Sequence, residues 1–128
     1  MSVKGVGIDL IRIERIARAC RRRPERFMKR IFTDKEIGML LKKRNPFPSI
    51  AARFAAKEAV AKALGCGIGL ISWREIEIFS DPRGKPLVFL TGKAASRAEK
   101  NGIKGVHLSM SHDGLYAAAT AAAYSETI

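Results

Sequence analysis

The densest group of residues that could do chemistry lies in one alanine-rich segment, residues 50–64 (IAARFAAKEAVAKAL). The segment carries the cations Arg53, Lys57 and Lys62 and a single acid, Glu58. Arg53 and Lys57 are four residues apart, as are Glu58 and Lys62, so each pair shares one face of a helix. Taken pair by pair, this is an ordinary solvated helix with a weak ion pair. Taken together, one carboxylate among several cations suits a polyphosphate bound with Mg²⁺, because the acid binds the metal and the cations bind phosphate oxygens.

A second acid, Asp9, follows a glycine-containing stretch, residues 3–10 (VKGVGIDL), whose pattern is typical of a short strand that leads into a helix. Two interpretations of Asp9 stay open. Its carboxylate could cap the following helix by accepting hydrogen bonds from the first free amides. It could instead face an open cleft at the end of the strand as a ligand of a hard metal ion.

Two other motifs carry less chemical information. The glycine loop at residues 65–69 (GCGIG) follows a helix instead of opening one, so it lacks the helix N-terminus that binds a diphosphate in dinucleotide-binding folds. Residues 111–113 (SHD) contain the residue types of a catalytic triad. Neighbouring residues on a strand point to opposite faces, so these three cannot form the relay. His112 is therefore either a buried, hydrogen-bonded histidine or a contact to a ligand phosphate.

A stripe of arginines follows the first helical pattern. Arg15, Arg18 and Arg22 share one helical face, and Arg26 follows soon after. Such a stripe is either a solvated charged face or a docking surface for an acidic partner.

The apolar spacing predicts the elements that must position these side chains. A strand at 3–10 precedes a helix at 11–23 that ends before Pro24. Thr33 and Glu36 have the spacing of a capping box at the start of a helix that runs to about residue 43. Ser49 is expected to cap the helix at 50–64, and Gly65 to end it in the left-handed conformation. The remaining elements are strands at 73–79 and 87–90, a short helix from 91 or 92 to 101, and a hairpin of strands at 106–112 and 115–123.

Helices that precede antiparallel hairpins indicate an α+β fold, with an antiparallel sheet packed against helices, one of them long and alanine-rich. The length of 128 residues predicts a single domain over residues 1–128. A hydrophobic content of 47% excludes intrinsic disorder. Cys20 and Cys66 form no CxxC pair, so neither a zinc site nor a disulfide framework is indicated. The lack of a long apolar run or a signal-peptide core predicts a soluble, cytoplasmic protein.

The net charge of +12 predicts an anionic partner, which could be nucleic acid, a membrane surface, an acidic protein or a phosphorylated ligand. An aromatic content of 7% disfavours base-stacking on single-stranded nucleic acid. A basic nucleic-acid-binding module remains the alternative hypothesis. It explains the charge, but not the acid set among cations on one helix.

Four short motifs occur in order along almost the whole chain: GID at 7–9, FAAKEAVAKALG at 54–65, GKP at 84–86 and SH at 111–112. Together they resemble the 4′-phosphopantetheinyl transferases and, more narrowly, the small bacterial holo-[acyl-carrier-protein] synthases. Larger members of this superfamily contain two such halves. The resemblance therefore implies the single-unit type, which forms a homotrimer with active sites between subunits.

The resemblance implies an α+β phosphopantetheinyl transferase fold and a Mg²⁺-dependent reaction. Such enzymes move the 4′-phosphopantetheine arm of coenzyme A to a serine of apo acyl carrier protein, release adenosine 3′,5′-bisphosphate and support fatty acid biosynthesis. The partners implied are coenzyme A and an acidic acyl carrier protein, and neither nucleic acid nor a membrane.

The resemblance also assigns roles to individual residues. Asp9 and Glu58 match the family's magnesium-binding carboxylates, and Lys62 matches the lysine that holds the transferring phosphate. We expect all three to be catalytic. Our hypothesis for the base that deprotonates the serine is Glu58, acting directly or through a metal-bound water. The residues expected to bind coenzyme A are Arg53, Lys57, Lys62, Gly65, Gly84, Lys85, Pro86, Ser111 and His112. The residues expected to dock the carrier protein are Arg15, Arg18, Arg22 and Arg26.

Overall fold

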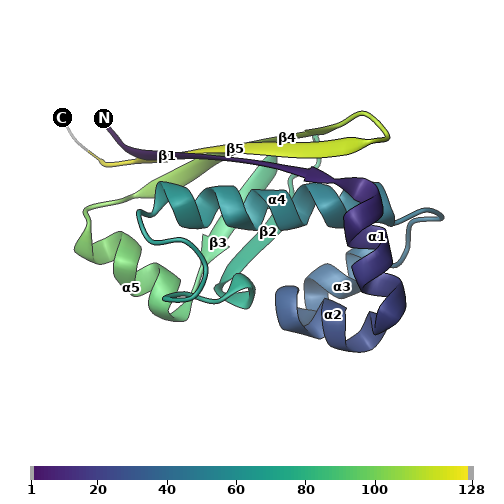
Figure 1. Ribbon diagram of the computed structural model, residues 1–128. Helices are drawn as coiled ribbons and strands as arrows, with labels where there is room; N and C mark the ends of the chain where they lie inside the picture. The colour runs from purple at the N-terminus through teal and green to yellow at the C-terminus, as the bar shows by residue number, and fades with distance from the viewer. Residues whose placement is uncertain (1, 127–128) are drawn as a thin grey trace.

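The two ends of the chain form one sheet and its middle forms another, in a computed structural model that describes residues 2–126. β1 (Val3–Arg12), β5 (Tyr116–Tyr124) and β4 (Gly105–His112) lie side by side in that order, and both pairings are antiparallel. β2 (Ile76–Ser80) and β3 (Pro86–Leu90) form a separate antiparallel hairpin. The first strand therefore joins the C-terminal hairpin through β5 (Figure 1).

The long helix α4 (Phe47–Ala63) runs along the inner face of the three-stranded sheet (Figure 1). Its buried surface is made mostly of small side chains, so the backbones of helix and sheet come close together. The buried residues of α4 are Ile50, Ala51, Ala52, Ala55, Ala56, Lys57, Ala59, Val60, Ala61 and Ala63. Gly7 on β1 continues this close packing, because a Cβ atom at Gly7 would overlap the carbonyl oxygen of Ala59.

Shorter helices lie near the two ends of α4 (Figure 1). Near its N-terminal end lie α1 (Ile13–Arg22), α2 (Pro24–Ile31) and α3 (Asp34–Leu40). Near its C-terminal end lies α5 (Gly92–Lys100). A single 3₁₀ turn, η1 (Trp73–Glu75), leads into β2. Among residues 2–126 no helix is both long and apolar enough to cross a membrane.

The α+β arrangement and several local predictions are confirmed. Thr33 and Glu36 form the capping box at the start of α3. Gly65 follows α4 with a φ of +85°, in the left-handed region that favours glycine. Ile76 and Ile78 of β2 are both fully buried, as their alternation with polar residues predicts.

Several predicted boundaries are wrong. β1 extends to Arg12, which pairs with Tyr116, so α1 begins two residues later than predicted. The helix α2 was not predicted, because Pro24 was interpreted only as an end. Proline fits the first turn of a helix, where its missing N–H has no intrahelical partner. For the same reason α4 includes Pro48 in its first turn, and Ser49 is not its cap. Trp73–Glu75 is a 3₁₀ turn instead of the start of the strand.

Candidate active site

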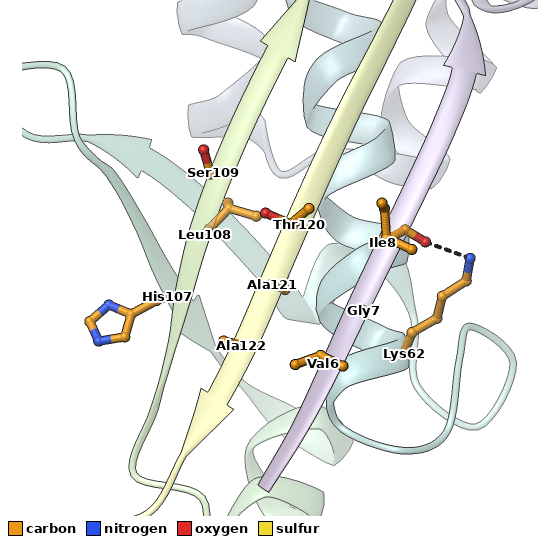
Figure 2. A pocket seen from close by; sticks show the side chains of 10 residues that line it. All are labelled: Val6, Gly7, Ile8, Lys62, His107, Leu108, Ser109, Thr120, Ala121 and Ala122. Carbon is orange, nitrogen blue, oxygen red and sulfur yellow. Dashed lines mark hydrogen bonds between the residues drawn. The ribbon is translucent and has the colours of Figure 1, made fainter. Parts of the chain in front are cut away.

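Asp9 and Lys62 meet where β1 crosses α4. Alternation along β1 puts Asp9 on the same face as Gly7, which packs against α4. The Lys62 Nζ lies 3.5 Å from Asp9 Oδ1. It also donates a hydrogen bond to the carbonyl oxygen of Ile8 at 2.8 Å (Figure 2). The Lys62 side chain remains 52% exposed and that of Asp9 19% exposed. This ion pair is therefore open to a ligand that approaches from solvent.

Glu58 lies one helical turn before Lys62 on α4, and its Oε2 accepts a hydrogen bond from Trp73 Nε1 at 3.2 Å. Burial raises the pKa of Glu58, and the nearby charge of Asp9 raises it further, while the Trp73 hydrogen bond and Lys62 act in the opposite direction. Burial also raises the pKa of Asp9, against the opposing effect of Lys62. The two acids therefore repel each other in a partly desolvated place.

The capping interpretation of Asp9 is wrong. Asp9 lies within β1, where it pairs with Ala119, and the residue that precedes α1 is Arg12. No side chain caps the first turn of α1. The Asp9 carboxylate faces Lys62 instead, and its interpretation as a metal ligand stays a prediction.

The two carboxylates fit Mg²⁺ shared with a phosphate ligand. No group of three or more His, Cys, Asp or Glu side chains that could hold a metal ion exists within residues 2–126. Mg²⁺ is commonly bound through one or two carboxylates, with waters and substrate phosphates as its other ligands. A divalent cation would also offset the two effects that raise the pKa of Glu58, which are its burial and the nearby charge of Asp9. The site therefore suits a metal that arrives with, or is completed by, a phosphorylated substrate.

The structure corrects the prediction that Lys57 binds coenzyme A. Its side chain is 0% exposed, and its Nζ lies 2.7 Å from Glu36 Oε1. The same Nζ donates to the carbonyl oxygens of Ile31 at 2.9 Å and Trp73 at 3.1 Å. These three bonds use the full donor capacity of the ammonium group. Lys57 is therefore a buried structural residue, and the prediction that it binds the ligand is wrong.

Sequence reasoning missed the second role of Glu36. The capping-box spacing assigned it only to the start of α3, and its Oε1 does accept from the Thr33 amide at 2.9 Å. Its Oε2 also accepts from the Ile78 amide at 2.9 Å, so this one carboxylate joins α3, α4 and β2. No local pattern indicates such a role, because the residues it joins are far apart in the sequence.

Arg53 lies beside the turn between β2 and β3. Its Nη2 donates to Ser80 Oγ at 3.3 Å, and Ser80 pairs with Pro86 of the GKP motif. Burial lowers the pKa of Arg53, an effect that the charge of Glu36 opposes. Its Nε is buried and has no hydrogen-bond partner in residues 2–126. Arg53 is therefore joined to the end of β2, and Gly84 and Lys85 of the turn that follows are both exposed.

Gly65, Ser111 and His112 are exposed. Gly65 lines a 340 Å³ cavity together with Lys62 at the end of α4. Ser111 and His112 lie at the end of β4, and no interaction within residues 2–126 joins either of them to Asp9, Glu58 or Lys62. The exposure of His112 shows that its interpretation as a buried histidine is wrong.

The predicted docking arginines are all exposed, on α1 and α2. Arg15 and Arg18 border a shallow hollow with Arg12 and Glu14. The opposite side of α1 is buried through Ile13, Ile16, Ala17 and Cys20. The helix therefore separates its apolar side from a charged side that faces solvent.

Comparison with known proteins identifies the family of the chain. The profile of the 4′-phosphopantetheinyl transferase superfamily matches residues 5–121. The chain is 48% identical over 118 residues to the holo-[acyl-carrier-protein] synthase of Caldanaerobacter subterraneus, a match that covers 92% of each chain.

Solved structures give the same result. The holo-[acyl-carrier-protein] synthase of Neisseria meningitidis superposes with a TM-score of 0.89 at 37% identity, over 96% of this chain and 99% of that one. The Helicobacter pylori enzyme, solved in complex with coenzyme A, superposes with a TM-score of 0.83 at 33% identity, over 93% of this chain and 99% of that one. On its sequence and its fold alike, the chain belongs to the 4′-phosphopantetheinyl transferase superfamily, among the holo-[acyl-carrier-protein] synthases.

Proposed function

We propose that Asp9, Glu58 and Lys62 form the site at which this member of the holo-[acyl-carrier-protein] synthases transfers the 4′-phosphopantetheine arm of coenzyme A to a serine of acyl carrier protein. The observation that carries the proposal is the open ion pair between Lys62 and Asp9, 3.5 Å apart, with Glu58 one turn away on the same helix. Two acids and one half-exposed cation match the charges of a diphosphate bound with a metal ion.

Each side chain has a distinct part in the reaction. Asp9 and Glu58 would hold Mg²⁺, which when bound neutralises charge on the diphosphate of coenzyme A. Lys62 donates to an oxygen of the phosphate that is transferred, in place of the Ile8 carbonyl that it contacts now. Glu58 takes the proton of the attacking serine, either directly or through a metal-bound water. The serine oxygen bonds to phosphorus, and adenosine 3′,5′-bisphosphate leaves with the electrons of the broken P–O bond.

The nucleotide end of coenzyme A would bind to the remaining predicted residues. Arg53 contacts Ser80, whose strand partner Pro86 follows Lys85 and the φ-positive Gly84, so this hairpin supplies a second cation and a glycine for the ligand. Gly65 lies beside Lys62 in one cavity and would let the ligand approach the backbone. Ser111 and His112 are exposed and do not contact the Asp9–Lys62 pair within residues 2–126. This favours binding of coenzyme A by Ser111 and His112 of a neighbouring subunit.

The outer face of the three-stranded sheet supports a homotrimer. Val6, Ile8 and Leu10 of β1 are 70%, 64% and 64% exposed. The apolar face continues across β5, and a 630 Å³ hollow lies over it between Val6, Ile8 and Thr120 (Figure 2). An exposed apolar face of this kind usually marks a protein–protein contact. Ser111 is in register with Leu10 through Ala118, so a subunit that covers this face would lie near Ser111.

The oligomeric state tests this part of the proposal. Sedimentation of the purified chain should give a trimer, and Val6→Glu should give monomers, because it puts a charge into the proposed apolar contact. Leu41→Glu is the matched control, since Leu41 is also apolar and 58% exposed but lies outside the sheet. A monomeric wild-type chain, or equal dissociation of both variants, would contradict the trimer.

The catalytic proposal is tested by mass spectrometry of the carrier protein. The purified chain, apo acyl carrier protein, coenzyme A and Mg²⁺ should give a carrier that gains the phosphopantetheine arm, and EDTA should stop the reaction. Glu58→Gln should abolish turnover, because an amide neither binds the metal as an anion nor accepts the serine proton. The exposed Glu25→Gln is the control and should keep full activity. If Glu58→Gln retains more than about a tenth of kcat, the role of Glu58 is wrong.

The transfer assay and a DNA-binding assay together distinguish the catalytic proposal from the alternative hypothesis. A tight, salt-dependent complex with duplex DNA in the absence of any transfer would favour a nucleic-acid-binding module. The cytoplasmic location stays a prediction.

A further inference from the structure

Trp73 is held at both of its ends by adjacent residues of α4. Lys57 donates from Nζ to the Trp73 carbonyl oxygen at 3.1 Å. The Trp73 indole donates from Nε1 to Glu58 Oε2 at 3.2 Å. Consecutive residues of a helix point about 100° apart, so two faces of α4 are joined to one residue of η1.

The Lys57 end of this connection is rigid. Lys57 and Glu36 are both fully buried, and their ion pair is 2.7 Å long. Glu36 is fixed in turn by the amides of Thr33 and Ile78. The Trp73 backbone is therefore attached to a network that includes α3, α4 and β2.

The indole ring is held by contacts of its own. Its centroid lies 5.9 Å from that of the Phe54 ring, and the Arg30 guanidinium lies 5.6 Å from it. A phenylalanine could fill most of this space, but it has no N–H. Within residues 2–126 the indole N–H is the one hydrogen-bond donor to the Glu58 carboxylate.

We propose that Trp73 is a positioning residue, whose indole N–H fixes one oxygen of Glu58 and thereby presets the other for the metal. The proposal rests on the proposed role of Glu58 as a metal ligand. A glutamate has several rotatable bonds, so a partner that fixes its carboxylate removes conformational freedom that metal binding would otherwise have to restrict. Loss of such an outer partner typically lowers metal affinity about 10–100-fold.

The test measures metal binding directly, without turnover. Mn²⁺ serves as the probe, titrated into the full chain in the presence of coenzyme A and followed by electron paramagnetic resonance. Trp73→Phe keeps the ring and removes the N–H, and it should raise the Mn²⁺ Kd about 10-fold. Phe54→Leu is the matched control, because it removes the ring contact and keeps the N–H; it should change the Kd less than about 2-fold. An unchanged Kd in folded Trp73→Phe would overturn the proposal.

Two further measurements keep the result unambiguous. In steady-state assays, Trp73→Phe should raise the Mg²⁺ concentration for half-maximal activity by a larger factor than it lowers kcat, which a purely structural role would not produce. Trp73 is the single tryptophan of the chain, so the fluorescence of the wild type reports on this contact. Mn²⁺ should quench it in the wild type and not in Glu58→Gln, and a wild-type signal that saturating metal does not change would overturn the proposal even if Trp73→Phe fails to fold.

The outcomes also distinguish this inference from the proposed function. If Glu58→Gln binds Mn²⁺ as tightly as the wild type, Glu58 is not a metal ligand, and both proposals fail together. If Glu58→Gln loses Mn²⁺ and Trp73→Phe does not, the proposed function stands and the role of Trp73 is overturned.

Discussion

Two lysine–carboxylate pairs on α4 have opposite characters. Lys57 and Glu36 are 2.7 Å apart with both side chains 0% exposed, whereas Lys62 and Asp9 are 3.5 Å apart with the lysine 52% exposed. Both lysines lie in the same alanine-rich helix, five residues apart. The first pair is closed by further hydrogen bonds to the backbone, and the second retains donor capacity that a ligand can use. Residue type and spacing alone therefore do not distinguish a buried ion pair from one that is open to solvent.

The difference follows from what packs over each lysine. Lys57 points toward α3, η1 and the end of α2, which together exclude water. Lys62 points toward the edge strand β1, beyond which lies solvent. A buried charge must be matched completely, because an unpaired charge in the interior is strongly destabilising. A charge at the edge can remain partly unpaired, and this leaves Lys62 accessible to a ligand.

The largest expected effect comes from breaking the closed pair. Lys57→Met should lower the free energy of unfolding by about 3–5 kcal/mol, because it leaves the Glu36 carboxylate buried without its cation. Chemical denaturation measures the change, and Lys62→Met on the same helix is the matched control, with an expected loss below about 1 kcal/mol. Equal losses in the two variants would show that the two pairs do not differ as their burial implies.

The open pair should show the reverse pattern. Lys62→Met should lower kcat about 100-fold, because one preorganised donor to the transferring phosphate is lost. The thermal midpoint should hardly change, since a half-exposed ion pair contributes little to stability. Lys62→Arg keeps the positive charge and tests whether that charge alone is enough to maintain kcat. A Lys62→Met variant with near wild-type kcat would remove Lys62 from the reaction.

The smallest effect is expected for charged side chains that are exposed and form no ion pair. Arg15 and Arg22 of α1 are exposed and form no salt bridge within residues 2–126. Replacing both with glutamate should raise KM for the acyl carrier protein about 10-fold through charge repulsion and leave the affinity for coenzyme A unchanged. Lys29→Glu, a reversal at the exposed end of α2, serves as the control. If coenzyme A binding falls equally, the arginines do not form a docking face.

Local patterns were enough to predict much of the framework. The capping box of Thr33 and Glu36, the left-handed Gly65 and the burial of Ile76 and Ile78 each depend on residues within a few positions of one another. The predictions failed where a local signal has two meanings. Pro24 ends one helical pattern and also begins the next helix, and only the packing of α2 against α1 shows which meaning applies.

Part of the candidate site was also predictable, because some of its residues belong to short sequence motifs. Asp9, Glu58 and Lys62 have residue types and spacing that match a family with a known chemistry, and the fold brings Asp9 to Lys62. The place of Asp9 within β1 was not predictable, because strand length is set by pairing with β5 from the other end of the chain. The role of Trp73 was equally unpredictable, since its hydrogen bond to Glu58 joins residues that no short-range pattern connects.

The sequence by itself determined the α+β composition, the long alanine-rich helix, the family and the acids that are set among cations. Those properties follow from residue type and from spacing along one element, where geometry is fixed by the backbone. Only the tertiary structure decided that Lys57 is buried and Lys62 is open, that Glu36 joins three elements, and that Trp73 reaches Glu58. The physical reason is that burial and ion pairing depend on which distant elements pack together, and this determines how much each charge is desolvated.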